Sequence, residues 1–119
     1  MKVLLGVDGS DLGYRALEET TRRAGEAGDE LTVAILGPAE SHEDLAAEVT
    51  DHLEAVGLQA EVHRLDDETG SRLVELADGG DFDRLVIGGG RRTPLGKIKL
   101  GPVAEFVLMN ATTTVTLVR

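Results

Sequence analysis

Short apolar runs that alternate with segments of helical spacing constrain the fold of this 119-residue chain most strongly. Residues 2–7, 31–36 and 84–87 form nearly continuous apolar runs, which are typical of strands buried on both faces. Residues 59–65 alternate more clearly between apolar and polar side chains, which indicates a shorter strand at a sheet edge. The β-branched residues 113–118 predict a last strand.

Between these runs, apolar residues recur at helical spacing and predict four helices, at residues 12–24, 45–56, 73–77 and 103–110. The first helix is expected to end at Gly25 and Gly28. Ser41, followed three residues later by Asp44, resembles a capping box for the second helix. The order βαβαβαβαβ predicts a parallel sheet with right-handed crossovers and helices on both faces.

Length and composition narrow the class of protein. A chain of this size with 41% apolar residues predicts one domain over residues 1–119. The absence of cysteine excludes disulfides, thiolate nucleophiles and sulfur-rich metal sites. The apolar runs are too short to span a membrane, and we expect a soluble, cytoplasmic protein. The net charge of −10 opposes nucleic-acid binding, and the excess of acids with few lysines suggests adaptation to a high-salt (halophilic) cytoplasm.

The segment 88–102 is the part of the sequence that is best suited to hold a ligand. Its residues 91–99 carry four cations and no anion, so they are locally +4, whereas the rest of the chain carries −14. Glycines allow backbone amides to approach a ligand, and the helix that follows adds free donors and a positive dipole end. This pattern predicts an anion site, with phosphate as the first hypothesis. The alternative is a flexible, solvated crossover loop.

Asp8 follows the first strand directly. In parallel sheets of this kind, ligands bind at the carboxyl ends of the strands, at the point where the strand order reverses. If the first and fourth strands are neighbours, Asp8 and the loop after Gly88 face one another across a crevice. The carboxylate would then accept hydrogen bonds from a base or ribose, or hold a metal. The alternative is an Asx-turn that caps the first helix alongside Ser10.

Other polar residues have structural interpretations. The acidic segment 66–68 is expected to be a solvated turn. The three histidines lack metal-ligand spacing and are interpreted as surface residues, and three serines near helix starts are interpreted as caps (His42, His52, His63; Ser10, Ser41, Ser71). Gly96-Lys97 is followed by Ile98, so the loop is not a Walker motif.

Several segments in combination resemble the universal stress protein family across essentially the whole chain. They are Val7-Asp8-Gly9-Ser10, the long loop between Gly88 and Gly101, the helix start Pro102-Val103-Ala104-Glu105, and Ala111-Thr112-Thr113-Thr114-Val115. The resemblance implies a three-layer α/β sandwich of the adenine nucleotide alpha hydrolase-like type, with a five-stranded parallel sheet of order 3-2-1-4-5. It also implies a homodimer through the C-terminal strand.

The nucleotide-binding branch of that family carries Gly-x2-Gly-x9-Gly-[Ser/Thr] around the ATP phosphates. Gly88 and Gly101 match the first and last glycines, whereas Arg91 replaces the second glycine and Pro102 replaces the hydroxyl residue. Pro102 removes an amide and a hydroxyl from the phosphate site. The positions that the resemblance assigns to nucleotide contact, charge or the base pocket are Val7, Asp8, Gly9, Ser10, Val33, Ala34, Gly88, Gly90, Arg92, Lys97, Gly101, Pro102 and Val103.

We expect a stress-response or regulatory module that binds ATP or a related adenine nucleotide weakly. Mg²⁺ is expected to bind only together with the nucleotide. We expect no efficient turnover, no catalytic residues and no resident metal; slow ATP hydrolysis stays an open alternative. The substitutions Arg91 and Pro102 favour a competing interpretation, a dimeric interaction protein of the non-nucleotide branch with an unidentified protein partner. No nucleic-acid or membrane partner is expected.

Overall fold

Five parallel strands form one sheet in the order β3-β2-β1-β4-β7, the order 3-2-1-4-5 predicted for the family fold. The computed structural model describes residues 1–89, 91–92 and 94–119, and only the backbone of Arg91, Arg92 and Ile98. The helices are α1 (Asp11–Ala27), α2 (His42–Val56), α3 (Thr69–Gly79) and α4 (Pro102–Asn110), with a 3₁₀ turn at Ala39–Ser41. The strands are β1 (Lys2–Val7), β2 (Glu30–Ile35), β3 (Ala60–Arg64), β4 (Arg84–Gly88), β5 (Arg91–Arg92), β6 (Ile98–Lys99) and β7 (Val115–Val118).

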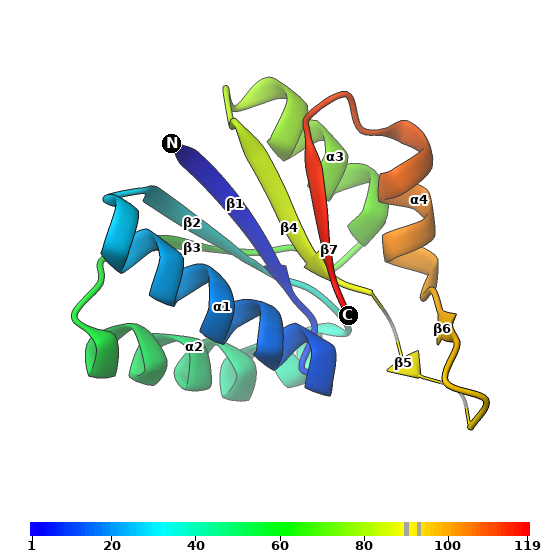
Figure 1. Cartoon of the computed structure of the whole chain (residues 1–119), viewed down its shortest axis with the longest axis horizontal. Helices are drawn as coiled ribbons and strands as arrows, with labels where there is room; N and C mark the ends of the chain where they lie inside the picture. Colours follow the sequence, from blue (N-terminus) through cyan, green and yellow to red (C-terminus); the bar gives the residue numbers. More distant parts are fainter. Residues whose placement is uncertain (90, 93) are drawn as a thin grey trace.

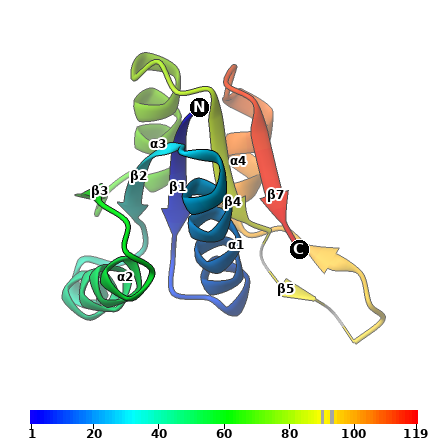
Figure 2. The ribbon, with the colours of Figure 1, turned by 60° about the vertical axis from the view of Figure 1, so that its left-hand side comes forward.

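Helices cover both faces of the sheet, with α1 and α2 on one side and α3 and α4 on the other (Figures 1 and 2). The alternation of side chains along the central strands creates two cores. Val3, Leu5 and Val7 of β1 lie in the core under α1 and α2, whereas Leu4 lies in the core under α3 and α4. Both faces of β1 are therefore buried, which explains its continuous apolar sequence. Within the described part of the chain, no helix is long and apolar enough to cross a membrane.

Several element boundaries differ from those predicted by the sequence. Helix α1 continues through the exposed Gly25 and ends at Ala27, because Gly28 adopts the left-handed conformation (φ 73°) and donates its amide to the Ala24 carbonyl. The last strand begins only at Val115, since Thr112 and Thr113 belong to the turn before it. The antiparallel pair β5 and β6 was not predicted; it lies inside the segment expected to be a loop.

The turn before β7 is held by one carboxylate. Asp78, near the end of α3, accepts hydrogen bonds from the Thr113 hydroxyl (2.7 Å) and from the backbone amides of Thr113 (3.0 Å) and Thr112 (3.2 Å). These bonds, chiefly those from Thr113, hold the pKa of Asp78 below its ordinary value. Asp78 thus links α3 to the start of the edge strand.

We expect Asp78→Ala to lower the melting temperature at neutral pH. Because the pKa of Asp78 is lower in the folded than in the unfolded chain, its contribution is present above the unfolded value, about 3.9, and is lost as the pH falls through the folded value. The difference from wild type should therefore shrink below about pH 4. Melting curves between neutral and acid pH test this, with the exposed Glu75→Ala on the same helix as the control. A constant difference at every pH would contradict it.

Candidate functional site

A small cavity of about 90 Å³ lies at the carboxyl edge of the sheet, where β1 and β4 end and α4 begins. These two strands are direct neighbours in the sheet, while the chain continues from each of them to opposite faces. The structure thus brings together the two regions that the sequence placed across a crevice. The lining residues are Gly6, Asp8, Leu36, Ile87, Gly88, Gly101, Pro102, Val103 and Ala104.

Asp8 has the local geometry of an Asx-turn. Its Oδ1 accepts hydrogen bonds from the Ser10 amide (3.0 Å) and the Ser10 hydroxyl (2.6 Å), and the Ser10 Oγ in turn accepts one from the Gly13 amide (3.0 Å). Ser10 is therefore the N-cap of α1, as predicted. Gly9 between them has a positive φ of 85°, which favours glycine. The carboxylate is exposed at the rim of the cavity while one of its oxygens orders the turn.

Two glycines allow the end of β4 to touch the start of α1. A Cβ on Gly88 would lie 2.8 Å from the Gly13 nitrogen and 2.8 Å from the Leu12 carbonyl carbon, so no larger residue fits without moving backbone. A Cβ on Gly13 would lie 2.6 Å from Asp8 Oδ1. Gly88 was predicted as a phosphate contact, and the structure gives it this packing role as well. Gly13 was missed, because only the folded chain reveals its approach to Asp8.

The start of α4 forms the opposite wall. Gly101 is the N-cap, and its carbonyl accepts the first helical bond from the Glu105 amide (3.0 Å). The amides of Val103 and Ala104 have no partner within the helix, because the first turn of a helix leaves its donors free. Pro102 stands at the first helical position and has no amide to offer. This wall therefore presents two backbone donors and the positive end of a helix dipole to a small anion.

The basic segment folds as a hairpin that projects beyond the carboxyl edge of the sheet (Figures 1 and 2). In it, Arg91 pairs with Lys99 and Arg92 with Ile98. Leu95, at the tip, is 85% exposed, and Lys97 and Lys99 are exposed as well. Gly90, a predicted contact, lies outside the described residues, as does the side chain of Arg92. None of the hairpin residues that the structure describes lines the cavity.

The predicted apolar contacts lie in the cores. Val7 and Val33 are fully buried beneath α1 and α2, and Ala34 is fully buried on the opposite face. Their side chains do not line the cavity, and Val33 and Ala34 lie within β2, which pairs with a strand on each side. Leu36, the residue after β2, lines the cavity instead. Sequence reasoning could not identify Leu36 as a lining residue, because a leucine after a buried strand is typical of core packing.

Several assignments of polar residues are corrected. Ser41 occupies the N-cap position of α2, but its side chain makes no capping bond: its hydroxyl donates to the Pro38 carbonyl (2.9 Å) and its backbone is already helical. Ser71 lies inside the first turn of α3 rather than at its cap. His42 is buried, and its Nε2 lies 2.8 Å from the Gly37 carbonyl, so it is not a surface residue. His52 joins α2 to α1 through Thr21 (2.8 Å).

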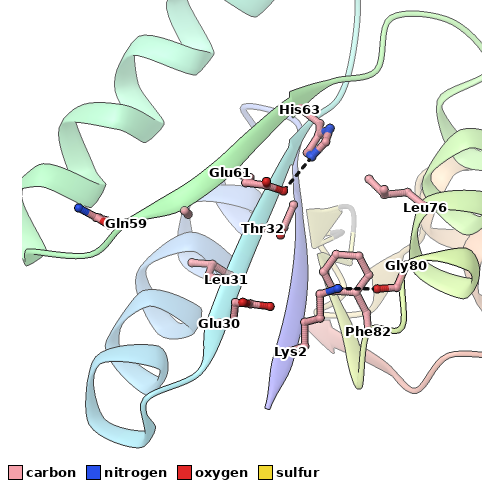
Figure 3. Close-up of a pocket in the computed structure, with 11 residues that line it drawn as sticks. Lys2, Glu30, Leu31, Thr32, Gln59, Glu61, His63, Leu76, Gly80 and Phe82 are labelled. Carbon is pink, nitrogen blue, oxygen red and sulfur yellow. Dashed lines mark hydrogen bonds and ion pairs between the residues drawn. The ribbon is translucent and has the colours of Figure 1, made fainter.

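A larger hollow of about 680 Å³ lies at the other end of the sheet, beside β2 and β3 (Figure 3). Some of its polar side chains already have partners. The Lys2 Nζ donates to the Gly80 carbonyl (2.7 Å) and lies 4.8 Å from the Phe82 ring centre, and His63 approaches Glu61 (3.5 Å). Of these two sites, the smaller cavity is the one that lies at a helix N-terminus, where free backbone amides suit an anion.

Comparisons with known proteins agree with this fold. The model of the universal stress protein family matches residues 34–119. A universal stress protein from Archaeoglobus fulgidus is 25% identical to this chain and superposes with a TM-score of 0.81; the match covers 100% of this chain and 98% of that one. A universal stress protein in complex with cAMP is 28% identical to this chain, with a TM-score of 0.78; the match covers 100% of this chain and 96% of that one. A universal stress protein from Archaeoglobus fulgidus in complex with dAMP is 23% identical to this chain, with a TM-score of 0.72; the match covers 100% of this chain and 98% of that one. No curated protein matches.

Proposed function

Because this chain belongs to the universal stress protein family, we propose that it binds an adenine nucleotide weakly at the carboxyl edge of its sheet and acts as a stress-response or regulatory module. One observation carries the proposal: Asp8, Gly88 and the first turn of α4 surround a single cavity. The similar structures crystallised with cAMP and dAMP support the choice of an adenine nucleotide. Mg²⁺ would enter only with the nucleotide, held by its phosphates.

The size of the cavity supports weak binding. Its volume of about 90 Å³ is well below the roughly 300–1,000 Å³ of typical small-molecule sites. The cavity therefore suits a phosphate group at the α4 amides, with the nucleoside lying outside it near the exposed Asp8 carboxylate. A ligand that buries only part of its surface gains less from apolar burial. The missing Pro102 amide weakens the phosphate contact further.

Calorimetric titration with ATP and Mg²⁺ at high and low salt tests the proposal. We expect heat of binding at millimolar nucleotide, and a loss of about ten- to a hundredfold in affinity in Asp8→Ala if the carboxylate bonds the nucleoside. Asp8→Asn is the matched control, because it keeps an oxygen for the Ser10 bonds while removing the charge. Folded protein that gives no heat at millimolar nucleotide would contradict ligand binding. Steady phosphate release that Asp8→Ala abolishes would point to an enzyme instead.

The exposed apolar side chains of α4 favour a second function, that of a dimeric interaction protein. Met109 is 78% exposed and Leu108 43% exposed, on a helix that is apolar on most sides. The neighbouring β7 is an edge strand of the sheet, and an edge strand offers unpaired backbone groups to another chain. We propose a homodimer through β7. Light scattering that reports a monomer at micromolar protein and high salt would contradict it.

A further inference from the structure

Besides the cavity and the larger hollow, a groove of about 310 Å³ lies on the α1 side of the sheet, between α1 and the strands β4 and β7. Its floor is apolar and consists of Val3, Val86 and Val118, which are 3%, 5% and 7% exposed. Arg84, at the amino end of β4, lines one end. The groove shares no lining residue with the cavity at the carboxyl edge of the sheet. Its volume lies at the lower end of the range for small-molecule sites.

The Nε of Arg84 is buried and has no hydrogen-bond partner in the described part of the chain. A buried donor without an acceptor is costly, and more so when the group is charged. The groove's own acids do not supply the acceptor. Asp29, whose side chain is 4% exposed, pairs with Arg23 (3.5 Å), and Glu19 pairs with Arg15 (3.2 Å). Among the described residues, no carboxylate therefore accepts a hydrogen bond from the Arg84 Nε at this end of the groove.

We propose that this groove binds a small amphipathic carboxylic acid, with its carboxylate on the Arg84 guanidinium and its apolar body along the valine floor. A planar guanidinium matches a carboxylate with two parallel hydrogen bonds. Besides Arg84, the charged residues of the lining sum to −1, so the groove suits a single carboxylate better than a multiply charged nucleotide; they are Glu19, Glu26, Asp29, Arg22 and Arg23. A second protein chain also fits poorly. The groove has eleven lining residues, fewer than the roughly 20–30 residues that each partner contributes to a stable interface.

Titration of the full chain with octanoate, below its micelle-forming concentration, tests the proposal by calorimetry and by amide shifts in NMR spectra. We expect one octanoate to bind and to shift the amides of Val86 and Thr116. Arg84→Gln should weaken it by about ten- to a hundredfold, through the loss of a charge-assisted hydrogen bond. Arg64→Gln, on the exposed edge strand β3 and outside the groove lining, is the matched control and should bind octanoate like wild type.

The ligand series makes the test independent of the stability of the variants. With wild-type protein, 1-octanol lacks the carboxylate and butyrate lacks most of the apolar body, so both should bind at least about tenfold more weakly than octanoate. Absence of octanoate binding at millimolar concentration, or equal affinity for octanol, would overturn the proposal. So would groove shifts that follow protein concentration rather than octanoate, since the groove would then be an interface between copies of the chain.

Discussion

Alanine at position 88 is expected to destabilise the protein by about 1–3 kcal/mol, as overpacking of a filled interior does. The added Cβ would lie 2.8 Å from the Gly13 nitrogen and the Leu12 carbonyl carbon and 3.0 Å from the Leu12 oxygen. All three are backbone atoms in the first turn of α1, so no side-chain rotation relieves the contact. Strand β4 is also fixed between β1 and β7 in the sheet. Chemical denaturation gives the free energy of unfolding directly.

Gly25→Ala provides the matched control for Gly88→Ala. Gly25 lies on the exposed side of α1, and a Cβ there has no neighbour within 4 Å. This substitution should stabilise the protein by about 0.5–1 kcal/mol, the difference in helix propensity. If Gly88→Ala left the free energy of unfolding unchanged, the close approach of β4 to α1 would be wrong.

Serine at position 102 is expected to raise the affinity for ATP by about ten- to a hundredfold. It restores the backbone amide and the hydroxyl that proline lacks, and a hydrogen bond to a charged group contributes roughly 1.5–3 kcal/mol. Pro102 lines the cavity at the first position of α4, so both new donors would enter the proposed phosphate site. Calorimetric titration of wild type and variant under identical salt conditions measures the change.

Pro102→Ala separates the two contributions, because it restores the amide without the hydroxyl. We expect an affinity between those of the wild-type and serine proteins. Equal affinities in all three proteins would show that the phosphate does not contact this turn. Binding that arises only in the serine variant would assign the native chain to the non-nucleotide branch of the family and favour the dimeric interaction protein.

The fold was predictable because its signals are local and repeated. Leu4 and Leu5 face opposite cores, so the buried strand β1 is a continuous apolar run that is readable without coordinates. The polar positions 61 and 63 mark β3 as an edge strand, which the structure confirms with exposed side chains. Weaker local signals failed. The strands β5 and β6 have two residues each and are rich in charge, so neither shows the alternation on which strand prediction depends.

The candidate site was predictable only in part, because several of its features arise from tertiary approach. Asp8, Gly88 and Gly101 were identified from their places at strand ends and a helix start. The contact of Gly13 with Asp8 and the position of Leu36 depend on how separate elements pack, and no spacing in the sequence encodes them. Ser41 illustrates the converse error. Its sequence pattern suits a cap, but the preceding 3₁₀ turn directs its hydroxyl to Pro38.

Residue-resolved NMR titration with ATP and Mg²⁺ tests the central proposal most directly, because it reports where the nucleotide binds as well as whether it binds. We expect saturable shifts of the amides of Asp8, Gly101, Val103 and Ala104, which lie around one cavity. Amides near Glu61 and His63, in the larger hollow at the other end of the sheet, should stay unchanged. Shifts confined to that hollow, or no shifts at millimolar ATP with folded protein, would contradict nucleotide binding at the carboxyl edge of the sheet.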